Sequence, residues 1–475
     1  MTIDCFTRPG CAQLIHEDES QVSYDFEMIH SLEECGLLDY AVICPSPPTT
    51  GAVVVVDPFS TGAHLAALIV KCGYKLILVF AQLDSPVAQL VTKGSNVKPQ
   101  LLIQHNASNP DQDAAIEDTI KAIATQGSPV LAILAGAETG VELADKLAAR
   151  YGTRGNGENM IKARRNKYVM QEVIRKSSIR AIKQKLVFDA DNAKEFLTTL
   201  PQPLKCVVKP NESAGSDSIF LCTSESEVFD AIKSINGAVN GLGNINYGAL
   251  CQEFLEGTEY VVDGVSRDGI YKVCALWEYD KRSVNGANFV YFGMKLRPCN
   301  TPLDFELIEY AKKVVHALEI NQGPSHMEIK YTADGPCLVE VGSRCHGGEG
   351  TWLPVVNECI GYSQVDATLN LYIRPDRFDA LPHIPSLSKQ GTEAFLVSYQ
   401  TGSLVEIPGI DTIRSLPSFR RMEMLTQPGA YITPTIDCFT RPGSAQLVNT
   451  DANDLRKDYE AIRSLEYEGL FSVSN

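Results

Sequence analysis

Residues 323–350, GPSHMEIKYTADGPCLVEVGSRCHGGEG, decide the fold. Two runs rich in β-forming residues, 326–331 and 336–341, flank the short segment Ala333-Asp334-Gly335. A three-residue hairpin loop holds its last residue in the left-handed conformation, which glycine adopts without steric cost, so Gly335 suits that position. The stretch therefore predicts an antiparallel β-hairpin.

The predicted loop also sets the register of the two strands. Counting back from it gives four facing pairs: Thr332 with Pro336, Ile329 with Val339, Glu328 with Glu340, and Met327 with Val341. The two glutamates would lie with their Cβ atoms about 5 Å apart, where like charges destabilise a hairpin. A divalent cation between them would offset the repulsion, and Mg²⁺ prefers such oxygen ligands.

The glutamate pair alone leaves two interpretations open. A metal site gains support from Arg344, further along the second run, because its guanidinium would bind phosphate beside the glutamates. The alternative is an exposed hairpin on which two surface glutamates happen to align. The rest of the chain has to decide between them.

The composition is that of a globular protein, and the 475 residues suffice for about three domains. A formal net charge of -16 argues against nucleic acid or an anionic membrane as a partner. Residues 1–10 lack the apolar core of a signal peptide, and the apolar stretch 65–80 is too short to span a bilayer. Fourteen cysteines without a CxxC pair predict reduced thiols in a cytoplasmic protein.

After a proline-rich linker at residues 45–48, strand-like and helix-like segments alternate. The predicted strands are 52–56, 75–80, 100–104 and 129–135, and the predicted helices lie near 61–72, 85–92, 116–125 and 141–151. This alternation predicts a parallel sheet covered by helices. The turns 57–62 and 136–140 follow strands, where such sheets bind ligands, but they are equally consistent with ordinary connecting turns.

The middle of the chain carries lysines next to small residues. A basic helical segment starts at Lys162, and a strand at 205–210 is followed by the turn NESAGSDS, residues 211–218. A lysine before such a turn can neutralise phosphates that backbone N–H groups cradle. Residues 236–248, rich in glycine and asparagine, fit either a lid or a long loop. Paired strands at 260–265 and 270–277, a helix at 303–320 and a β-rich remainder from Gly391 complete the pattern.

In this order, the lysines, the small turn, the run QEFLEGTEY (252–260) and the twin-glutamate hairpin closed by an arginine resemble the ATP-grasp superfamily of ADP-forming carboxylate–amine ligases. The resemblance is greatest to the L-amino-acid ligases that form dipeptides. It covers roughly residues 50–448, and the ordered set is more specific than any single member. It favours the metal site over the chance alignment.

The resemblance implies a fold of mixed α/β and α+β class. Residues 45–155 would form an N-terminal parallel, Rossmann-like α/β domain. The two-lobed ATP-grasp fold would follow, with a central lobe and its phosphate flap at 156–255 and a C-terminal lobe with a β-rich tail at 256–475. Residues 1–44 would stand apart as a repeat of the C-terminal tail.

The resemblance also implies roles for residues that match the family's motifs. The ATP contacts would be Lys167 and Lys209 on the phosphates, Ser213, Gly215 and Ser216 in the flap, Gln252, Glu253 and Leu255 at adenine, and Glu259 at the ribose. Glu328 and Glu340 would bind Mg²⁺ or Mn²⁺, and Arg344 would be catalytic. Two positions depart from the family pattern: Gln252 stands where an acidic residue is common, and Gly342 replaces the asparagine of E-x-N-x-R.

Candidate substrate contacts lie next to these groups. Gly347 and Gly348 belong to the loop CHGGEG (345–350), whose N–H groups can hold the carboxylate of an amino acid. His346 lies in the same loop, and His326 shares the glutamates' face of the hairpin, although a structural role suits His326 somewhat better than substrate contact. The polar run YDKR, residues 279–282, is either a further substrate contact or a solvated loop.

The resemblance implies an ATP- and Mg²⁺-dependent enzyme. It would activate a carboxylate as an acyl phosphate and join it to an amine, with small-molecule substrates and an amino acid among them. The alternatives are an ATP-binding protein without turnover and a ligase for carboxylates other than amino acids. The sequence names neither substrate, because specificity depends on loop shapes.

The two ends of the chain repeat each other. Residues 435–448, TIDCFTRPGSAQLV, match residues 2–15 except at Cys11/Ser444 and Ile15/Val448. We expect 435–448 to form the last strand and turn of the C-terminal lobe, followed by a closing helix at 455–470. Residues 2–43 are then either the tail of a preceding module in a longer tandem chain or a segment that docks on a second copy to give a homodimer.

Overall fold

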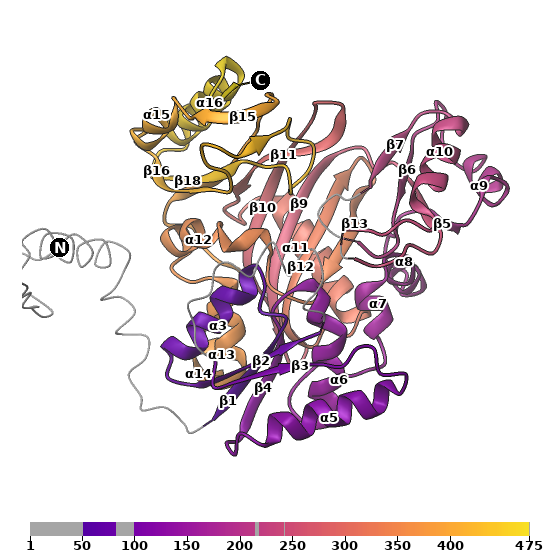
Figure 1. Ribbon diagram of the computed structural model, residues 1–475, viewed down its shortest axis with the longest axis vertical. Helices are drawn as coiled ribbons and strands as arrows, with labels where there is room; N and C mark the ends of the chain where they lie inside the picture. The colour runs from indigo at the N-terminus through magenta and orange to yellow at the C-terminus, as the bar shows by residue number, and fades with distance from the viewer. Residues whose placement is uncertain (1–50, 82–98, 214–217, 242, 475) are drawn as a thin grey trace, which may run out of the picture.

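The computed structural model describes residues 51–81, 99–213, 218–241 and 243–474 (Figure 1). The helix expected near residues 85–92, the N-terminal repeat and the flap residues Gly215 and Ser216 lie outside the described residues. The described chain forms four sheets, three of them antiparallel and one parallel.

The N-terminal part folds as the predicted parallel sheet. Its strands pair in the order β3-β2-β1-β4, with the bounds β1 Ala52–Val56, β2 Lys75–Phe80, β3 Leu101–Gln104 and β4 Val130–Ala135. The pairs are parallel, and helices α3 (Thr61–Lys71), α5 (Gln112–Ala124) and α6 (Val141–Tyr151) connect or follow the strands. Helix α5 begins before the predicted residue 116 because Asp111 caps it by accepting a hydrogen bond from the Ala114 N–H.

The central lobe is a separate antiparallel sheet with its own helices (Figure 1). Its strands pair in the order β5-β8-β6-β7, with the bounds β5 Gln184–Val187, β6 Cys206–Lys209, β7 Phe220–Cys222 and β8 Ala249–Glu253. Helices α9 (Ala190–Leu197) and α10 (Glu225–Ile235) pack on it. Its apolar core draws only on residues between Val187 and Cys251.

The basic helical segment that precedes this lobe is broken into two helices. Helix α7 (Ile161–Arg165) ends at Asn166, and α8 (Lys167–Lys176) begins there because the Asn166 side chain accepts a hydrogen bond from the Val169 N–H. Asparagine is a favoured residue at this position of a helix. The break puts Lys167 in the first turn of α8.

The C-terminal lobe is built on an eight-stranded sheet in the order β13-β12-β9-β10-β11-β14-β18-β16. Its strands are β9 Thr258–Arg267, β10 Ile270–Val284, β11 Ala287–Leu296, β12 Gln322–Thr332, β13 Gly335–Gly342, β14 Gln390–Leu396, β16 Phe419–Met424 and β18 Gly443–Asn449. Helix α11 (Pro302–Ala317) packs behind β12 and β13. Helices α12 (Leu353–Ile360), α13 (Gln364–Ile373) and α14 (Pro375–Ala380) follow the hairpin.

The hairpin pairs Glu328 with Glu340 and Met327 with Val341, as predicted. The loop itself differs: Thr332 pairs with Gly335, so the turn has two residues, and Ile329 pairs with Leu338 instead of Val339. A bulge beside Glu328 adds back the residue that the shorter turn removes. The shorter turn and the bulge offset each other, so the glutamates keep their predicted pairing. Gly335 has the expected positive φ, at 90°.

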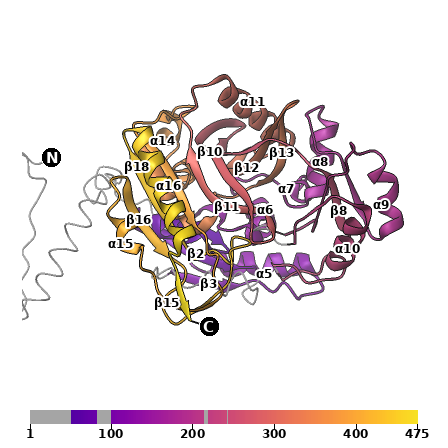
Figure 2. The ribbon, with the colours of Figure 1, turned by 90° about the horizontal axis from the view of Figure 1, so that it is seen from above.

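The C-terminal tail differs from its prediction. Strand β18 lies between β14 and β16 inside the large sheet, and helix α16 (Ala452–Glu468) covers it (Figure 2). Strand β19 (Ser472–Ser474) follows α16, so β18 is not the last strand. Strand β19 joins β15 (Gly402–Glu406) and β17 (Tyr431–Ile432) in a three-stranded sheet.

One apolar core joins the N-terminal sheet to the large sheet. It contains Val53 and Val55 of β1 together with Trp277 of β10 and Trp352, all fully buried. Helices α3 and α13 also contact each other across this junction. Buried thiols such as Cys274 help to fill the interior, as expected of reduced cysteines. Within the described residues, every helix is too short or too polar to cross a membrane.

Candidate active site

A cavity of about 260 Å³ lies between the central-lobe sheet and the large sheet. Strands β6 and β8 supply one wall, and β9, β10, β11, β12 and β13 supply the other. The predicted site residues that line it are Lys167, Lys209, Ser213, Gln252, Glu253, Leu255, Glu259, His326, Glu328, Glu340, Arg344, His346, Gly347 and Gly348. The fold thus brings to one place residues that are widely separated in the sequence.

Two lysines stand at the cavity's centre. Lys167 Nζ donates to the Ser213 carbonyl at 2.6 Å and lies 2.9 Å from Glu340 Oε2. Lys209 is buried at the end of β6, where burial lowers the pKa of its ammonium to about 8, with Glu340 opposing that change and Lys167 adding to it. A bound anion would stabilise the charged form of Lys209 and raise this pKa again.

The opposed glutamates are not on an exposed surface. The Glu328 side chain is 13% accessible and has His326 Nε2 3.9 Å from its Oε1. Burial alone would raise the pKa of Glu328, but the charge of Lys281 and the His326 contact hold it far below its usual value. Glu328 and Glu340 face each other in the cavity wall, and a pair of carboxylates is a donor set that a hard divalent cation takes.

Three predicted nucleotide contacts already have partners within the protein. Glu259 forms an ion pair with Lys281, whose ammonium also lies 4.2 Å from the ring centre of Tyr291. The Glu253 N–H donates to the Lys183 carbonyl at 3.0 Å, so it is engaged in the lobe and not open to a ligand. Gln252 donates its side-chain amide to Gln184 at 3.1 Å.

Arg344 is held by a residue that the sequence did not single out. Its Nε lies 2.9 Å from Oε2 of Glu138, which also forms an ion pair with Arg165. Burial would raise the pKa of Glu138, but Arg165 and Arg344 outweigh it and lower the pKa to about 2. Glu138 lies in the turn 136–140 after β4, so this turn orients a cavity arginine.

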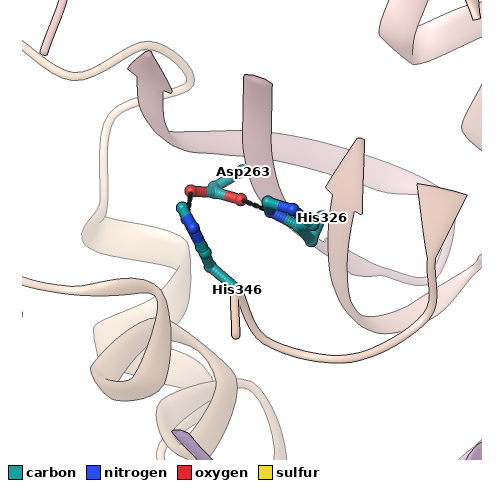
Figure 3. A group of neighbouring side chains, drawn as sticks. All are labelled: Asp263, His326 and His346. Carbon is teal, nitrogen blue, oxygen red and sulfur yellow. Dashed lines mark hydrogen bonds and ion pairs between the residues drawn. The ribbon is translucent and has the colours of Figure 1, made fainter. Parts of the chain in front are cut away.

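A second unpredicted residue, Asp263, binds both candidate histidines (Figure 3). The Nδ1 atoms of His326 and His346 lie 2.8 Å from its two carboxylate oxygens, and Trp277 Nε1 donates to one of them at 2.9 Å. Asp263 is fully buried; burial would raise its pKa, but the two imidazoles lower it well below its usual range. An ionised carboxylate only accepts, so each Nδ1 carries a proton and each Nε2 is left for other partners.

Within the described chain, Asp263, His326 and His346 form a group of three whose ligand atoms are close enough together to hold a metal ion. Their ligand atoms already satisfy one another through the hydrogen bonds to Asp263. The cluster therefore fixes the two rings in place. Asp263 is the one acidic residue in the segment Tyr260–Val265 of β9, and this charge within a largely apolar segment is the signal that could have found it.

The loop at 345–350 is tied to the N-terminal sheet. The Gly347 carbonyl accepts from Thr61 Oγ1 and from Trp352 Nε1, both at 2.9 Å, and the Glu349 N–H donates to Ser60 Oγ at 3.0 Å. The turn 57–62, for which a binding role and a connecting role were both open, thus holds this loop in position.

The sequence and the fold match known proteins. Residues 165–348 match the family model of the ATP-grasp domain. Dapdiamide A synthase of Enterobacter agglomerans is 29% identical over 423 residues, 87% of this chain and 95% of that protein. Alanine–anticapsin ligase of Bacillus subtilis (strain 168) is 24% identical over 56% of this chain and 58% of that protein.

Among solved structures, an L-amino acid ligase from Bacillus licheniformis superposes with a TM-score of 0.70 at 15% identity, covering 90% of this chain and 100% of that one. This likeness shows the fold, in which a parallel α/β sheet precedes two lobes that enclose a cavity. The chain thus carries a match to the ATP-grasp domain at residues 165–348, and it is similar over most of its length to dapdiamide A synthase and in fold to an L-amino acid ligase.

Proposed function

We propose that the protein uses ATP to join a carboxylate to an amine, through an acyl phosphate, with an amino acid as one substrate. The observation that carries the proposal is the meeting of Lys167, Lys209, Glu328, Glu340 and Arg344 in one cavity of an ATP-grasp domain. Names of the relatives, a dapdiamide synthase and amino acid ligases, support the amino acid.

The lysines and the arginine hold negative charge. Lys167 and Lys209 bind the phosphates of ATP, since their ammonium groups face the cavity beside the flap residue Ser213. Glu328 and Glu340 hold Mg²⁺ or Mn²⁺, which neutralises phosphate oxygens when it is bound. Arg344, oriented by Glu138, stabilises charge on the transferring phosphoryl group and on the later tetrahedral intermediate.

The chemistry has two steps. An oxygen of the substrate carboxylate attacks the γ-phosphorus of ATP, the bond from that phosphorus to the β–γ bridging oxygen breaks, and ADP leaves. The neutral amine then attacks the acyl carbon, phosphate leaves with the electron pair of the carbon–oxygen bond, and a proton is lost from nitrogen. Ordered groups around both centres convert the reaction into an effectively intramolecular one.

A second candidate is an ATP-binding protein without turnover. The complete set of cationic and acidic groups favours catalysis, because nucleotide binding alone does not need the opposed carboxylates. The same set is compatible with a ligase for carboxylates other than amino acids. We also propose a cytoplasmic location and no nucleic-acid or membrane partner, which the net charge of -16 supports.

The test is ADP and phosphate release across a matrix of paired amino acids and amines, with Mg²⁺ and ATP, and mass spectrometry of the products. The proposal expects stoichiometric ADP, phosphate and amide for a subset of pairs, and strongly reduced formation of all three by Glu340→Gln. ATP binding without ADP formation for any pair would favour the non-catalytic candidate. Amide formation only with acids that are not amino acids would favour the other ligase branch.

A further inference from the structure

The repeated nonapeptide TIDCFTRPG brings an arginine into the cavity. Its C-terminal copy, residues 435–443, connects β17 to β18, and Cys438 and Arg441 of this segment line the cavity. The proposed function above gives this segment no role. Arg441 is therefore a cavity cation without an assigned contact to ATP or to the metal ion.

Arg441 differs from three other cavity cations in having no ion-pair partner among the residues that the structure describes. Lys167, Lys281 and Arg344 each form an ion pair with a glutamate, whereas Arg441 forms none with the residues that the structure describes. Its guanidinium lies 4.5 Å from the ring centre of Phe395, and its Nε is buried with no hydrogen-bond partner among the described residues. Arg441 as a whole is half-buried, but a buried N–H without a partner is costly unless an acceptor on a ligand completes it.

Two acidic residues lie in the neighbourhood without pairing with Arg441. Glu393 is fully buried and accepts hydrogen bonds from Thr351 and Gln446, and burial raises its pKa. Burial also raises the pKa of Glu349, and at both carboxyl groups the charge of Arg441 opposes that rise without forming an ion pair. Within the described residues, neither carboxylate comes within 4.0 Å of the Arg441 nitrogens. The guanidinium thus keeps its capacity for another carboxylate.

Arg441 lies across the sheet from the phosphate-binding groups. Its neighbour Phe395 is on β14, and three strands, β9, β10 and β11, separate β14 from the Glu328 strand β12. The wall between them is aromatic, since the Tyr291 and Phe395 ring centres are 6.3 Å apart and Tyr291 lies beside Lys281. An anion at Arg441 is therefore not a phosphate of the nucleotide held at Lys167 and Lys209.

We propose that Arg441 binds a carboxylate of the amine substrate, so that the amine is itself an amino acid. This inference rests on the proposed function. The carboxylate of the acid substrate, which is activated, must lie beside Arg344 and the glutamates. A carboxylate bound at Arg441 must therefore belong to the other substrate, the amine. A planar guanidinium binds a carboxylate with two parallel hydrogen bonds, whereas a neutral amide in its place loses the charge and one acceptor.

The test compares each amino acid that serves as the amine in the matrix with its own carboxamide, which keeps the nucleophilic nitrogen and the side chain. We expect wild-type kcat/KM to be at least about 100-fold higher for the acid than for the carboxamide, as for loss of a charge-assisted bidentate contact. Arg441→Met should bring that ratio close to one and leave the KM for ATP unchanged. Arg441→Lys should give an intermediate ratio, because it keeps the charge and loses the fork.

Arg456→Met, an exposed arginine on helix α16 of the same lobe, is the matched control and should keep the wild-type ratio. Equal use of acid and carboxamide by the wild type, or an unchanged ratio in Arg441→Met, would overturn the inference while leaving the ligase activity standing. Absence of ADP formation for every pair would instead count against the proposed function.

The inference stays testable without turnover. Calorimetric titration of the same amino acids and carboxamides into the wild type, with Mg²⁺ and a non-hydrolysable ATP analogue present, should give binding of at least one acid and weaker binding of its carboxamide. Arg441→Met and Arg441→Lys, checked for wild-type melting temperature, should lose that difference wholly and in part. Equal affinity of the wild type for the amino acid and for its carboxamide would overturn the inference.

Discussion

Glu328 and Glu340 carry like charges in directly facing positions, and each has a cation close by. Lys167 neutralises Glu340, and His326 and Lys281 stand beside Glu328. The repulsion that the sequence implied is therefore balanced inside the protein even before a metal is considered. The protein can therefore fold with both carboxylates in place, and a bound metal ion would share them with these cations.

Replacing either carboxylate with glutamine should remove catalysis and spare the fold. We expect Glu328→Gln or Glu340→Gln to lower the rate of ADP formation at least about 100-fold, because the phosphoryl charge loses its counter-ion site. Glutamine keeps the size of the side chain and one accepting oxygen, and it removes the repulsion between the two carboxylates, so the melting temperature should stay within a few degrees. Glu309→Gln, exposed on α11, serves as the control. Near-normal turnover, or unfolding, would speak against the metal site.

Lys209 should matter for binding more than for the later chemistry. We expect Lys209→Ala to weaken ATP binding about 30-fold or more, since the variant removes a buried cation from the bound phosphates. Lys233→Ala, exposed on α10 of the same lobe, should leave the dissociation constant unchanged. Calorimetric titration with ATP measures both, and equal affinity of Lys209→Ala and wild type would remove Lys209 from the phosphate site.

Glu138 gives the protein a pH-dependent contribution to stability. Its folded pKa of about 2 lies below the ordinary value of 4.5, so its ionised form stabilises the protein above pH 4.5, and this contribution is lost as the pH falls toward 2. We expect Glu138→Gln to be less stable than wild type at pH 7 by on the order of 3 kcal/mol. Urea unfolding at pH 7, 5, 4 and 3 should show the difference narrowing below pH 4.5. A difference that is constant with pH would contradict the assigned ion pairs.

At the scale of elements, local patterns predicted most of the fold. Strands β1 and β2 and helix α6 have their predicted bounds, because apolar periodicity and glycine turns act over a few residues. The hairpin register came out right at the glutamates because a bulge compensated for a shorter turn. A bulge has no signature in a single sequence, so that compensation could not be foreseen.

Contacts between distant elements were the ones that sequence reasoning missed. Glu138 meets Arg344, and Asp263 meets His346, only because the N-terminal sheet and the large sheet share one core. Periodicity places each residue on its own element and says nothing about which elements meet. The motif residues, in contrast, could be assigned because the family resemblance carries long-range information that periodicity lacks.

At the scale of the molecule, the repeated sequence at the two ends of the chain raises the question of what the N-terminal copy does. The C-terminal copy forms β18, which pairs with β14 on one side and β16 on the other, so the position that this sequence takes in the sheet is already filled. We propose that residues 1–44 are the tail of a preceding tandem module. The rival account has them exchange with a second copy to give a dimer.

Deleting residues 1–43 should separate these accounts. We expect the shortened protein to be soluble, to melt at the temperature of the full chain and to form ADP at the same rate, because no place in the sheet is vacated. Light scattering should give the same molar mass per assembled particle after allowing for the deletion. Loss of folding, or conversion of a dimer into a monomer, would favour exchange.

The central lobe has an apolar core of its own, confined to residues between Val187 and Cys251, whereas the N-terminal and large sheets share theirs. Amide hydrogens of β6 and β8 can therefore exchange with solvent when the lobe opens alone, at a lower free energy than global unfolding. A nucleotide that contacts Lys209 on one side and Glu328 on the other binds only the closed arrangement. Saturating ATP should then slow deuterium uptake selectively in the central lobe, and the amides of β1 and β4 should be unaffected.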